Sequence, residues 1–176
     1  MAQLIGLHED PVDAFSPFEA ELRRRLWWHI CGLESRGAEE GGARQTSIME
    51  ERDIHLPLNL NDCDIRPDMR DPPMPRNGIT DLTFVLARWE SVRVVHSLFS
   101  AKKKYKSIGQ RLDSPDLQKE QRLLLAEHKA RCEAHYLQYL DQSRPMDWMV
   151  MQWIRLMGVR ISQHSYSLRT LNLCGR

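Results

Sequence analysis

The residues best suited to bind a metal ion lie on one short segment. His128, Cys132 and His135 are separated by four and three positions, so a helix would place all three on one face. Imidazole nitrogens and thiolates are ligands for zinc and copper. A complete site would need a further ligand, which the sequence does not indicate. The alternative interpretation is a half-buried seam in which the cysteine packs as a small apolar side chain.

A second group of polar residues, on the loop from Asn59 to Asp64, offers oxygen ligands. Counted from Asn59, the positions that an EF-hand fills with glycine and glutamate hold Asp64 and Arg70, so the calcium pattern is absent. Hydrogen bonding in turns and helix caps explains these short polar side chains better. Nucleophile motifs and glycine-rich phosphate loops are also absent from the sequence. We therefore expect no enzyme activity and no cofactor in this chain.

The densest cluster of functional side chains combines cations with indole rings. It consists of Arg23, Arg24, Arg25, Leu26, Trp27 and Trp28. Arginines beside tryptophans could bind phosphates and stack on bases. The alternative interpretation is structural: the apolar residues pack in the core, and the arginines form the i,i+4 pairs Glu19–Arg23 and Glu21–Arg25 or pair with neighbouring helices. We favour the structural interpretation because Leu22, Leu26 and Ile30 form one apolar stripe.

A run of lysines is the most localised charge in the sequence. Four of the six lysines fall within five positions, at Lys102, Lys103, Lys104 and Lys106. Nuclear-import receptors recognise short basic runs of this kind, and such runs also contact phosphates. The alternative is a solvated helix C-terminus, where cations interact favourably with the helix dipole. The sequence leaves both interpretations open.

Composition limits the class of protein. The chain has 176 residues, a formal net charge of +1 and 41% hydrophobic residues, values typical of a globular domain. They exclude a polybasic nucleic-acid coat and a disordered chain. The apolar stretches are too short to span a membrane and the N-terminal segment lacks a signal-peptide pattern, so we expect no membrane attachment. No two of the four cysteines are closely spaced, which disfavours disulfides and cysteine-paired structural zinc.

Helix signals occupy most of the chain and predict an all-α fold, an irregular helical bundle forming a single domain over residues 1–176. Five of the nine prolines lie between residues 57 and 75, so residues 54–80 are predicted to form an extended connector. Ser16, Thr80 and Ser114 are predicted N-caps, and Pro145 is predicted to open the last helix. The predicted helices span residues 2–8, 16–36, 81–106, 115–140 and 145–170.

Apolar spacing predicts which helix faces are buried. In the helix over residues 16–36, a stripe predicted to face the core consists of Leu22, Leu26, Ile30 and Leu33. In the last helix, the predicted inward face consists of Met149, Trp153, Leu156, Met157 and Ile161.

The order of several motifs resembles a known family. The motifs are IGLHEDP at residues 5–11, FSPFEAELRRRLWWHI at 15–30, IHLPLNLNDCDI at 54–65 and ITDLTFVLAR at 79–88. Together they resemble the fungal-specific transcription factor domain, the regulatory middle region of binuclear zinc-cluster transcription factors. The match runs from Leu4 to about Arg93 and continues more loosely through HYLQYLDQSRPMDW at residues 135–148.

The resemblance implies an all-α regulatory region, located in the nucleus and without catalytic residues. Family members read DNA through a separate six-cysteine module that holds zinc. This sequence contains neither that module nor a coiled coil, and the first half of the middle region is also missing. We therefore expect a truncated regulator of RNA polymerase II transcription, with a metabolic gene cluster as one class of target.

The same resemblance sets the expected partners. The chain by itself is not expected to bind DNA sequence-specifically, and its partner would be another regulator or a second copy. The alternative is an independent all-α protein-interaction module without a transcriptional role.

Overall fold

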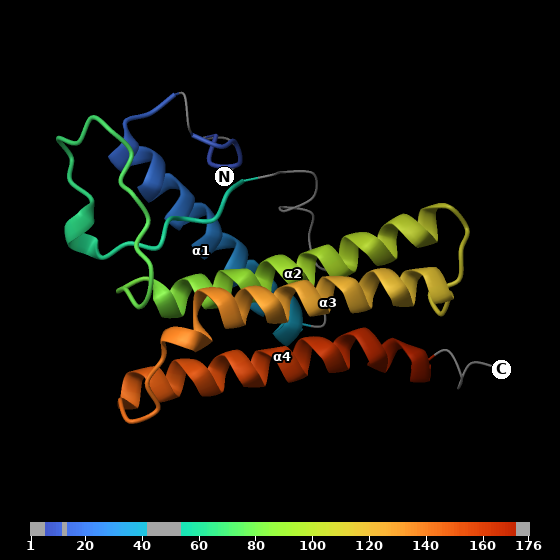
Figure 1. Cartoon of the computed structure of the whole chain (residues 1–176). Coiled ribbons are helices and arrows are strands. Elements are labelled where there is room, and N and C mark those ends of the chain that lie inside the picture. The colour runs from blue at the N-terminus through green and yellow to red at the C-terminus, as the bar shows by residue number, and fades with distance from the viewer. Residues whose placement is uncertain (1–5, 12–13, 42–53, 172–176) are drawn as a thin grey trace. The chain divides into compact units, whose positions relative to one another are not determined.

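Four long helices and two short 3₁₀ turns make up the regular structure of the described chain. The computed structural model describes residues 6–11, 14–41 and 54–171. In chain order the elements are α1 (Pro17–Gly41), η2 (Asp62–Asp64), α2 (Thr83–Ser107), α3 (Pro115–His135), η3 (Leu137–Tyr139) and α4 (Pro145–Leu171) (Figure 1). These described ranges contain no strand, so the predicted all-α fold is confirmed.

The chain divides into two compact units, residues 1–92 and 93–176. The first unit contains α1, the connector from Ile54 to Leu82 and the first part of α2. The second contains the rest of α2 together with α3, η3 and α4. From the sequence we expect a single domain over residues 1–176. That expectation stays a prediction.

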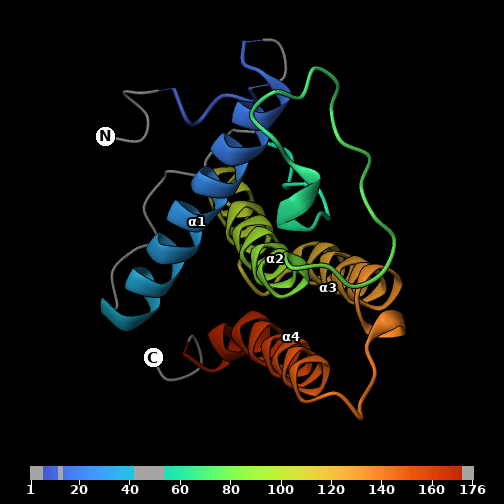
Figure 2. The ribbon, with the colours of Figure 1, turned by 90° about the vertical axis from the view of Figure 1, so that its left-hand side faces the viewer.

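Three helical segments build the core of the second unit. The second part of α2 runs antiparallel to α3, and α3 runs antiparallel to α4 (Figure 1). Figure 2 shows these three helices nearly end-on. The core cluster joins Val94 and Leu98 of α2 to Ile161 of α4, with exposures of 2%, 4% and 2%. Leu124 and Met157 pack against this cluster. Each such large apolar side chain contributes roughly 1.5–3 kcal/mol when it is fully removed from water.

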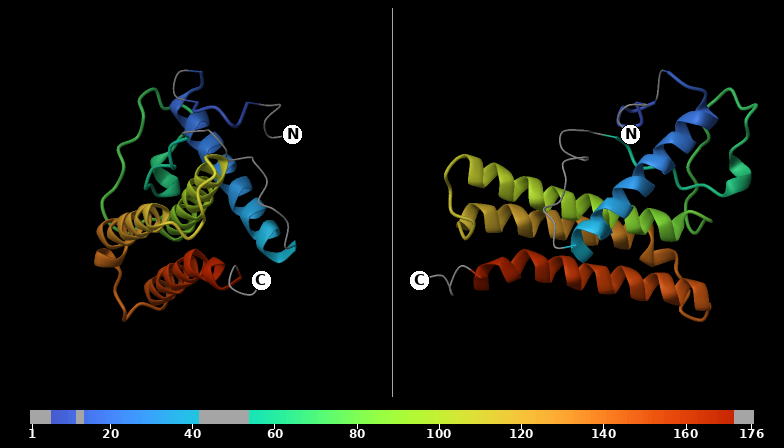
Figure 3. Two further views of the ribbon diagram at one scale, coloured as in Figure 1. Left: turned by 90° about the vertical axis from the view of Figure 1, so that its right-hand side faces the viewer. Right: turned by 180° about the vertical axis from the view of Figure 1, so that it is seen from behind.

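The first unit is built around α1 and the proline-rich connector, and the last residues of the connector lead into the start of α2 (Figure 3). Residues 54–82 form no helix or strand except the turn η2, as the density of prolines predicts. The buried side chains include Trp27, Trp28 and Cys31 of α1, Leu60 of the connector and Leu86 of α2. Leu60 has no exposed surface, which shows that the connector supplies core residues of its own.

The predicted inward stripe of α1 is wrong. Leu22, Leu26 and Leu33 are 41%, 48% and 54% exposed. The opposite face is buried instead, with Trp27 and Cys31 only 2% and 1% exposed. An indole ring buries more apolar area than a leucine side chain, so orienting α1 to bury its tryptophans removes more apolar surface from water.

The predicted inward face of α4 is wrong in part. Ile161 is 2% exposed, as predicted, but Met149 and Leu156 are 39% and 58% exposed. Val150 and Ile154, at 6% exposure each, take the inward positions. Because apolar residues surround almost the whole circumference of α4, their spacing alone does not select the buried face.

Two predicted helices differ from the structure within the described residues. Residues 2–5 lie outside the described residues, and residues 6–9 form a turn closed by the Glu9 N–H and the Gly6 carbonyl at 3.4 Å. Gly6 has φ +66°, which an α-helix does not allow. The predicted helix over 115–140 ends at His135, because Tyr136 adopts φ −129° and ψ −65° with its side chain buried at 6% exposure. The 3₁₀ turn η3 follows.

The predicted end of the first long helix at residue 36 is wrong, because α1 continues to Gly41. The remaining helix bounds lie within two residues of the predicted ones. Ser16 and Ser114 are confirmed as N-caps, because their hydroxyls accept the N–H groups of Glu19 at 3.3 Å and Leu117 at 3.4 Å. α2 begins at Thr83 rather than residue 81, since the Thr80 hydroxyl accepts the Leu82 N–H at 3.2 Å and forms a separate turn first. α4 begins at Pro145 as predicted.

Candidate functional site

The arginine–tryptophan segment of α1 is positioned by the way the helix begins. The Glu19 carboxylate accepts the Ser16 N–H at 3.2 Å while the Glu19 N–H donates back to the Ser16 hydroxyl, which is a complete capping box. The helix therefore starts at a defined residue. This start fixes the direction in which Arg23, Arg24 and Arg25 leave the helix two turns later.

Each of the three arginines contacts another group of the first unit. The Arg23 guanidinium lies 4.0 Å from the centre of the Phe15 ring, a cation–π contact. Arg24 Nη2 donates to Asp10 Oδ1 at 2.7 Å, and Arg25 Nε donates to Glu21 Oε1 at 3.0 Å. These contacts engage the arginines inside the chain and support the structural interpretation of the segment over the nucleic-acid one.

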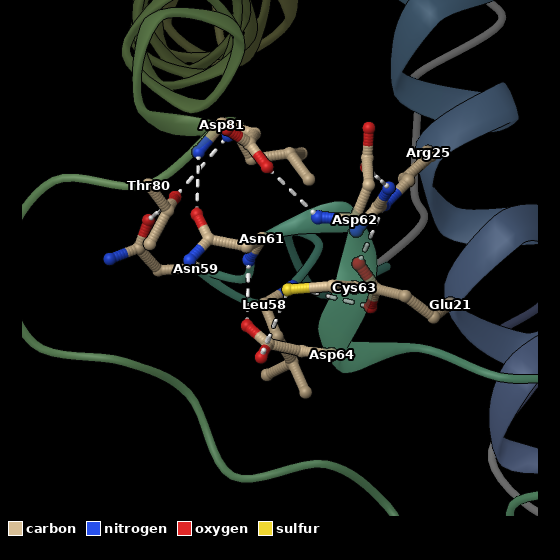
Figure 4. Close-up of polar contacts among 11 residues, drawn as sticks. Glu21, Arg25, Leu58, Asn59, Asn61, Asp62, Cys63, Asp64, Thr80 and Asp81 are labelled. Atoms are coloured by element: carbon tan, nitrogen blue, oxygen red, sulfur yellow. Dashed lines mark hydrogen bonds and ion pairs between the residues drawn. The ribbon is translucent and has the colours of Figure 1, made fainter.

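Glu21 is a buried carboxylate held between α1 and the connector. Its side chain is 1% exposed, and its second oxygen, Oε2, accepts the Leu58 N–H at 3.3 Å. Figure 4 shows Arg25 between Glu21 and Asp62, and Arg25 Nη1 donates to Asp62 Oδ1 at 3.0 Å. A buried charge is tolerated only when it is paired and hydrogen-bonded, so this arrangement fixes the connector to α1.

The connector closes on itself through two asparagines. Asn59 Nδ2 donates to the carbonyls of Arg76 and Gly78 at 2.8 and 2.9 Å, and its Oδ1 accepts the Thr80 hydroxyl at 2.6 Å. Asn61 Oδ1 accepts the Asp81 N–H at 3.0 Å (Figure 4). The Asn and Asp residues therefore satisfy backbone groups in a segment without regular structure, as expected from turn chemistry.

Asp64 is the most strongly perturbed carboxyl of this network. The Arg76 guanidinium donates through Nε and Nη2 to both of its oxygens, and the Asn61 N–H donates to Oδ2 at 2.8 Å. The Arg76 hydrogen bonds, followed by that of the Asn61 backbone, lower the pKa of Asp64 to about 2. Asp64 is thus an anion and a hydrogen-bond acceptor at neutral pH, and it is not suited to act as a proton donor.

Asp10 joins the N-terminal segment to both α1 and the connector. Its Oδ2 lies 2.8 Å from His55 Nδ1 and accepts the His55 N–H at 3.2 Å, while Oδ1 binds Arg24. Trp28 Nε1 donates to the His55 carbonyl at 3.0 Å. Burial raises the pKa of Asp10, but the hydrogen bonds from Arg24 and His55 outweigh it and lower the pKa overall.

We call the network of these residues the polar clamp. It consists of Asp10, Glu21, Arg24, Arg25, His55, Asn59, Asn61, Asp62, Asp64, Arg76, Thr80 and Asp81. The spacing in the sequence predicts the i,i+4 pair Glu21–Arg25, and the structure confirms it. The partners Asp10 and Arg76 were missed, because 14 and 12 residues separate them from Arg24 and Asp64 and no local pattern links such positions.

The candidate metal ligands are only partly brought together. His128 and Cys132 are both 4% exposed, and the Cys132 Sγ lies 3.7 and 3.8 Å from the two ring nitrogens of His128. His135 is exposed and its ring centre lies 6.3 Å from that of Tyr136. Within the described part of the chain, no three His, Cys, Asp or Glu residues lie close enough together to hold a metal ion.

The lysine run occupies the end of α2. Lys102 is partly buried, with its ammonium 5.5 Å from the Phe99 ring centre, and burial lowers its pKa. Lys103, Lys104 and Lys106 are exposed, and Lys104 Nζ lies 4.0 Å from Glu120 of α3. The run therefore presents a positive surface at the C-terminal end of a helix, where cations complement the dipole. No helix in the described residues is both long and apolar enough to cross a membrane.

Known proteins similar to this chain are fungal transcription regulators. The transcriptional regulator AacuB of Aspergillus aculeatus is 30% identical over 171 residues, which are 93% of this chain and 22% of that protein. The C6 finger domain transcription factor hasF of Aspergillus fumigatus is 31% identical over 173 residues, covering 86% of this chain and 22% of that protein. The aurofusarin cluster transcription factor aurR2 of Gibberella zeae is 40% identical over 92 residues, 51% of this chain and 14% of that protein.

The fold and the polar clamp define an all-α region. The charged and polar side chains of the clamp bind one another and the backbone, and thereby stabilise the structure. This region is homologous to part of the fungal C6 zinc-cluster transcription factors, so the resemblance noted in the sequence is confirmed. The chain spans about a fifth of the length of the relatives that match most of it. No protein-family model matches the chain, and no solved structure matches it significantly.

The zinc of the family does not fit the cysteines described here. Cys31 and Cys132 are buried on α1 and α3, whereas Cys63 is exposed on η2, and Cys174 lies outside the described residues. Burial, with a smaller contribution from the Glu34 charge, raises the pKa of Cys31 to about 12. A thiol with such a pKa does not readily become the thiolate that binds zinc.

Proposed function

We propose that this chain acts in the control of transcription, as a non-catalytic region of a fungal zinc-cluster regulator that works through contacts with other proteins. The observation that carries the proposal is its similarity to named transcription regulators over as much as 93% of its residues. The structure adds that the arginine–tryptophan segment, its densest cluster of functional side chains, is engaged in packing and in the polar clamp.

On this proposal, sequence-specific DNA recognition lies outside this chain. The chain has four cysteines without a closely spaced pair, and a C6 module needs six. The three arginines that could have bound phosphates contact Phe15, Asp10 and Glu21 instead. On this proposal the chain binds no cofactor, carries out no reaction and responds to or recruits a protein partner in the nucleus.

A tethering assay tests the proposal. The chain is fused to an unrelated DNA-binding domain and placed at a reporter promoter in a filamentous fungus, with the DNA-binding domain alone as the control. We expect reporter transcription to change, and to return to the control level when Arg25→Met breaks the polar clamp. A folded tethered chain that leaves the reporter unchanged would overturn the proposal and favour an all-α interaction module without a transcriptional role.

Nuclear localisation is tested separately through the lysine run. The chain is fused to a fluorescent reporter too large to diffuse through nuclear pores. We expect nuclear accumulation, and its loss when Lys103, Lys104 and Lys106 are changed to Gln. The matched control changes Lys119 and Lys129, the only other lysines, to Gln and is expected to leave accumulation intact. Equal localisation of both variants would remove the lysine run from the proposal.

A further inference from the structure

The loop that joins α2 to α3 begins with an exposed hydroxyl directly after the lysine run (Figure 1). Ser107 is the last residue of α2, and every residue over 106–113 is exposed. Gly109 has φ +72°, and its N–H and that of Gln110 donate to carbonyls of the last helical turn at 3.1 and 3.0 Å. These two hydrogen bonds form a Schellman motif, which ends the helix at Ser107.

Ser107 differs from the other exposed serines in the charges that precede it. Among the serines whose side chains the structure describes, Ser100, Ser107 and Ser143 are exposed. Ser100 comes before the lysines within α2, and the Ser143 hydroxyl donates to the Asp141 carboxylate at 2.8 Å. Of these three, Ser107 alone follows lysines, at one, three, four and five positions before it. It is therefore the accessible hydroxyl that is combined with a basic run.

The lysine side chains beside Ser107 are accessible to an approaching protein. Lys103, Lys104 and Lys106 are exposed. Lys104 Nζ lies 4.0 Å from Glu120 Oε1, and the Lys104 side chain is 66% exposed. Such a surface pair contributes only about 0–1 kcal/mol, so it does not prevent the ammonium group from binding a second anion. Lys103 and Lys104 precede Ser107 by four and three positions, and helical spacing places them on the same side of α2.

We propose that Ser107 is phosphorylated by a protein kinase whose substrate groove carries carboxylates, and that the phosphate inactivates the lysine run as a nuclear-import signal. Carboxylates that receive the residues before the acceptor select a serine that follows a basic run. The last turn of a helix unwinds easily, so residues 104–107 can enter the groove in an extended form. The effect on import rests on the role proposed above for the lysine run, whereas the phosphorylation itself does not.

The chemical step is phosphoryl transfer from ATP. Ser107 Oγ forms a bond to the γ-phosphorus, the bond between that phosphorus and the oxygen that bridges it to the β-phosphate breaks, and ADP leaves with the electron pair. The hydroxyl proton passes to a base of the kinase. In the unmodified chain this hydroxyl donates to the Lys104 carbonyl at 2.8 Å. The phosphate ester has no such proton, so phosphorylation also removes this hydrogen bond from the helix end.

The phosphate would act on the lysine run through charge. It carries about −1.5 to −2 at pH 7, and the C-terminal end of a helix disfavours an anion. Its favourable contacts are therefore with Lys103 and Lys104, one turn earlier in α2. The four lysines of the run supply four positive charges, so the phosphate offsets up to about half of them. A receptor that recognises these charges then binds the run more weakly.

Phosphorylation is tested with the purified full chain, ATP and Mg²⁺. Two kinases that select basic residues are used, cyclic-AMP-dependent protein kinase and protein kinase C, and mass spectrometry locates the phosphate. We expect at least one of them to modify Ser107 and expect Ser107→Ala to abolish this modification. Changing Lys103, Lys104 and Lys106 to Gln should lower the initial rate at Ser107 by about tenfold or more, because the charges that the groove recognises are lost.

The matched control removes lysines elsewhere in the chain. Changing Lys119 and Lys129 to Gln should leave the rate at Ser107 unchanged, since both residues lie outside the run. Circular dichroism spectra and urea midpoints that match those of the unmodified chain show that each variant is folded. Transfer to Ser100 or Ser143 in place of Ser107, no transfer to Ser107 by either kinase, or an equal rate in the variant of the run would overturn the assignment of the site.

The effect on import is tested with the chain fused to a large fluorescent protein and added to permeabilised cells supplied with cytosol. We expect the unmodified fusion to accumulate in nuclei, the phosphorylated fusion to remain outside, and phosphatase treatment to restore accumulation. A Ser107→Ala fusion incubated with the same kinase is the control and should accumulate normally.

The two measurements separate the site from its proposed effect. Equal nuclear accumulation of the phosphorylated and unmodified fusions would refute the effect on import. Exclusion of the unmodified fusion as well would refute the import role of the lysine run, while phosphorylation of Ser107 in the purified chain would still establish the modification site. Loss of phosphorylation together with normal import of the unmodified fusion would refute the site and keep the import role.

Discussion

Glu21 shows how much a single side chain contributes to the first unit. It is 1% exposed, and its two oxygens bind Arg25 at 3.0 Å and the Leu58 N–H at 3.3 Å. Removing its cationic partner would leave a buried carboxylate with the backbone donor only. Such an uncompensated charge is more destabilising than the loss of the pair as a whole.

We therefore predict that Arg25→Met lowers the free energy of unfolding by about 3 kcal/mol, as for a buried ion pair that loses one partner. Adding Glu21→Gln to this variant should recover part of the loss, because a neutral amide is less costly to bury than a carboxylate. Urea denaturation of the two single variants and the double variant measures the coupling. Additive effects of the two substitutions would contradict the buried pair.

The bidentate contact between Asp64 and Arg76 gives a pH-dependent prediction. The pKa of Asp64 falls from its ordinary 3.8 to about 2, so its ionised form is stabilised in the folded state. This stabilisation is fully present above pH 3.8 and is lost as the pH falls through 2.

We expect a carbon-detected NMR titration to show Asp64 still ionised at about pH 3, well below its ordinary range. In Arg76→Gln the pKa of Asp64 should move back toward 3.8, because the guanidinium donors are the largest cause of the shift. An Asp64 titration that is the same in both proteins would refute the assigned contact.

At the scale of elements, α1 has an outward leucine face and an inward tryptophan face, and stability measurements distinguish them. Leu26 is 48% exposed, so Leu26→Gln should change the free energy of unfolding by no more than about 0.5 kcal/mol. Its neighbour Trp27 is 2% exposed, so Trp27→Ala should cost about 3–5 kcal/mol. Urea denaturation of both variants is sufficient, and a larger effect at Leu26 would reverse the assignment of the faces.

At the scale of the whole molecule, the near balance of charges controls solubility. The chain has a formal net charge of +1 and an isoelectric point of about 7.8, and it contains seven histidines. We expect light scattering at fixed concentration to be strongest near pH 7.8 and to fall at about pH 6, where the chains carry more positive charge and repel one another. High salt should reduce the difference. Scattering that increases on acidification would contradict this prediction.

The sequence by itself determined the properties that depend on neighbouring residues. The proline-rich connector, the Ser16 and Ser114 caps and the i,i+4 pair Glu21–Arg25 were all predicted from local spacing and are confirmed. Helix starts are predictable because their N-caps satisfy donors within three residues. The family resemblance came from ordered motifs, and the similar regulators confirm it.

Tertiary structure decided what depends on contacts between distant residues. It selected the tryptophan face of α1 for burial, ended α3 at the buried Tyr136, and paired Asp64 with Arg76 across the connector. Periodicity gives the faces of a helix but not which face has a partner, because this depends on the apolar area and charge offered by segments elsewhere in the chain. For the same reason, the exposure of Met149 and Leu156 on α4 could be recognised only after folding.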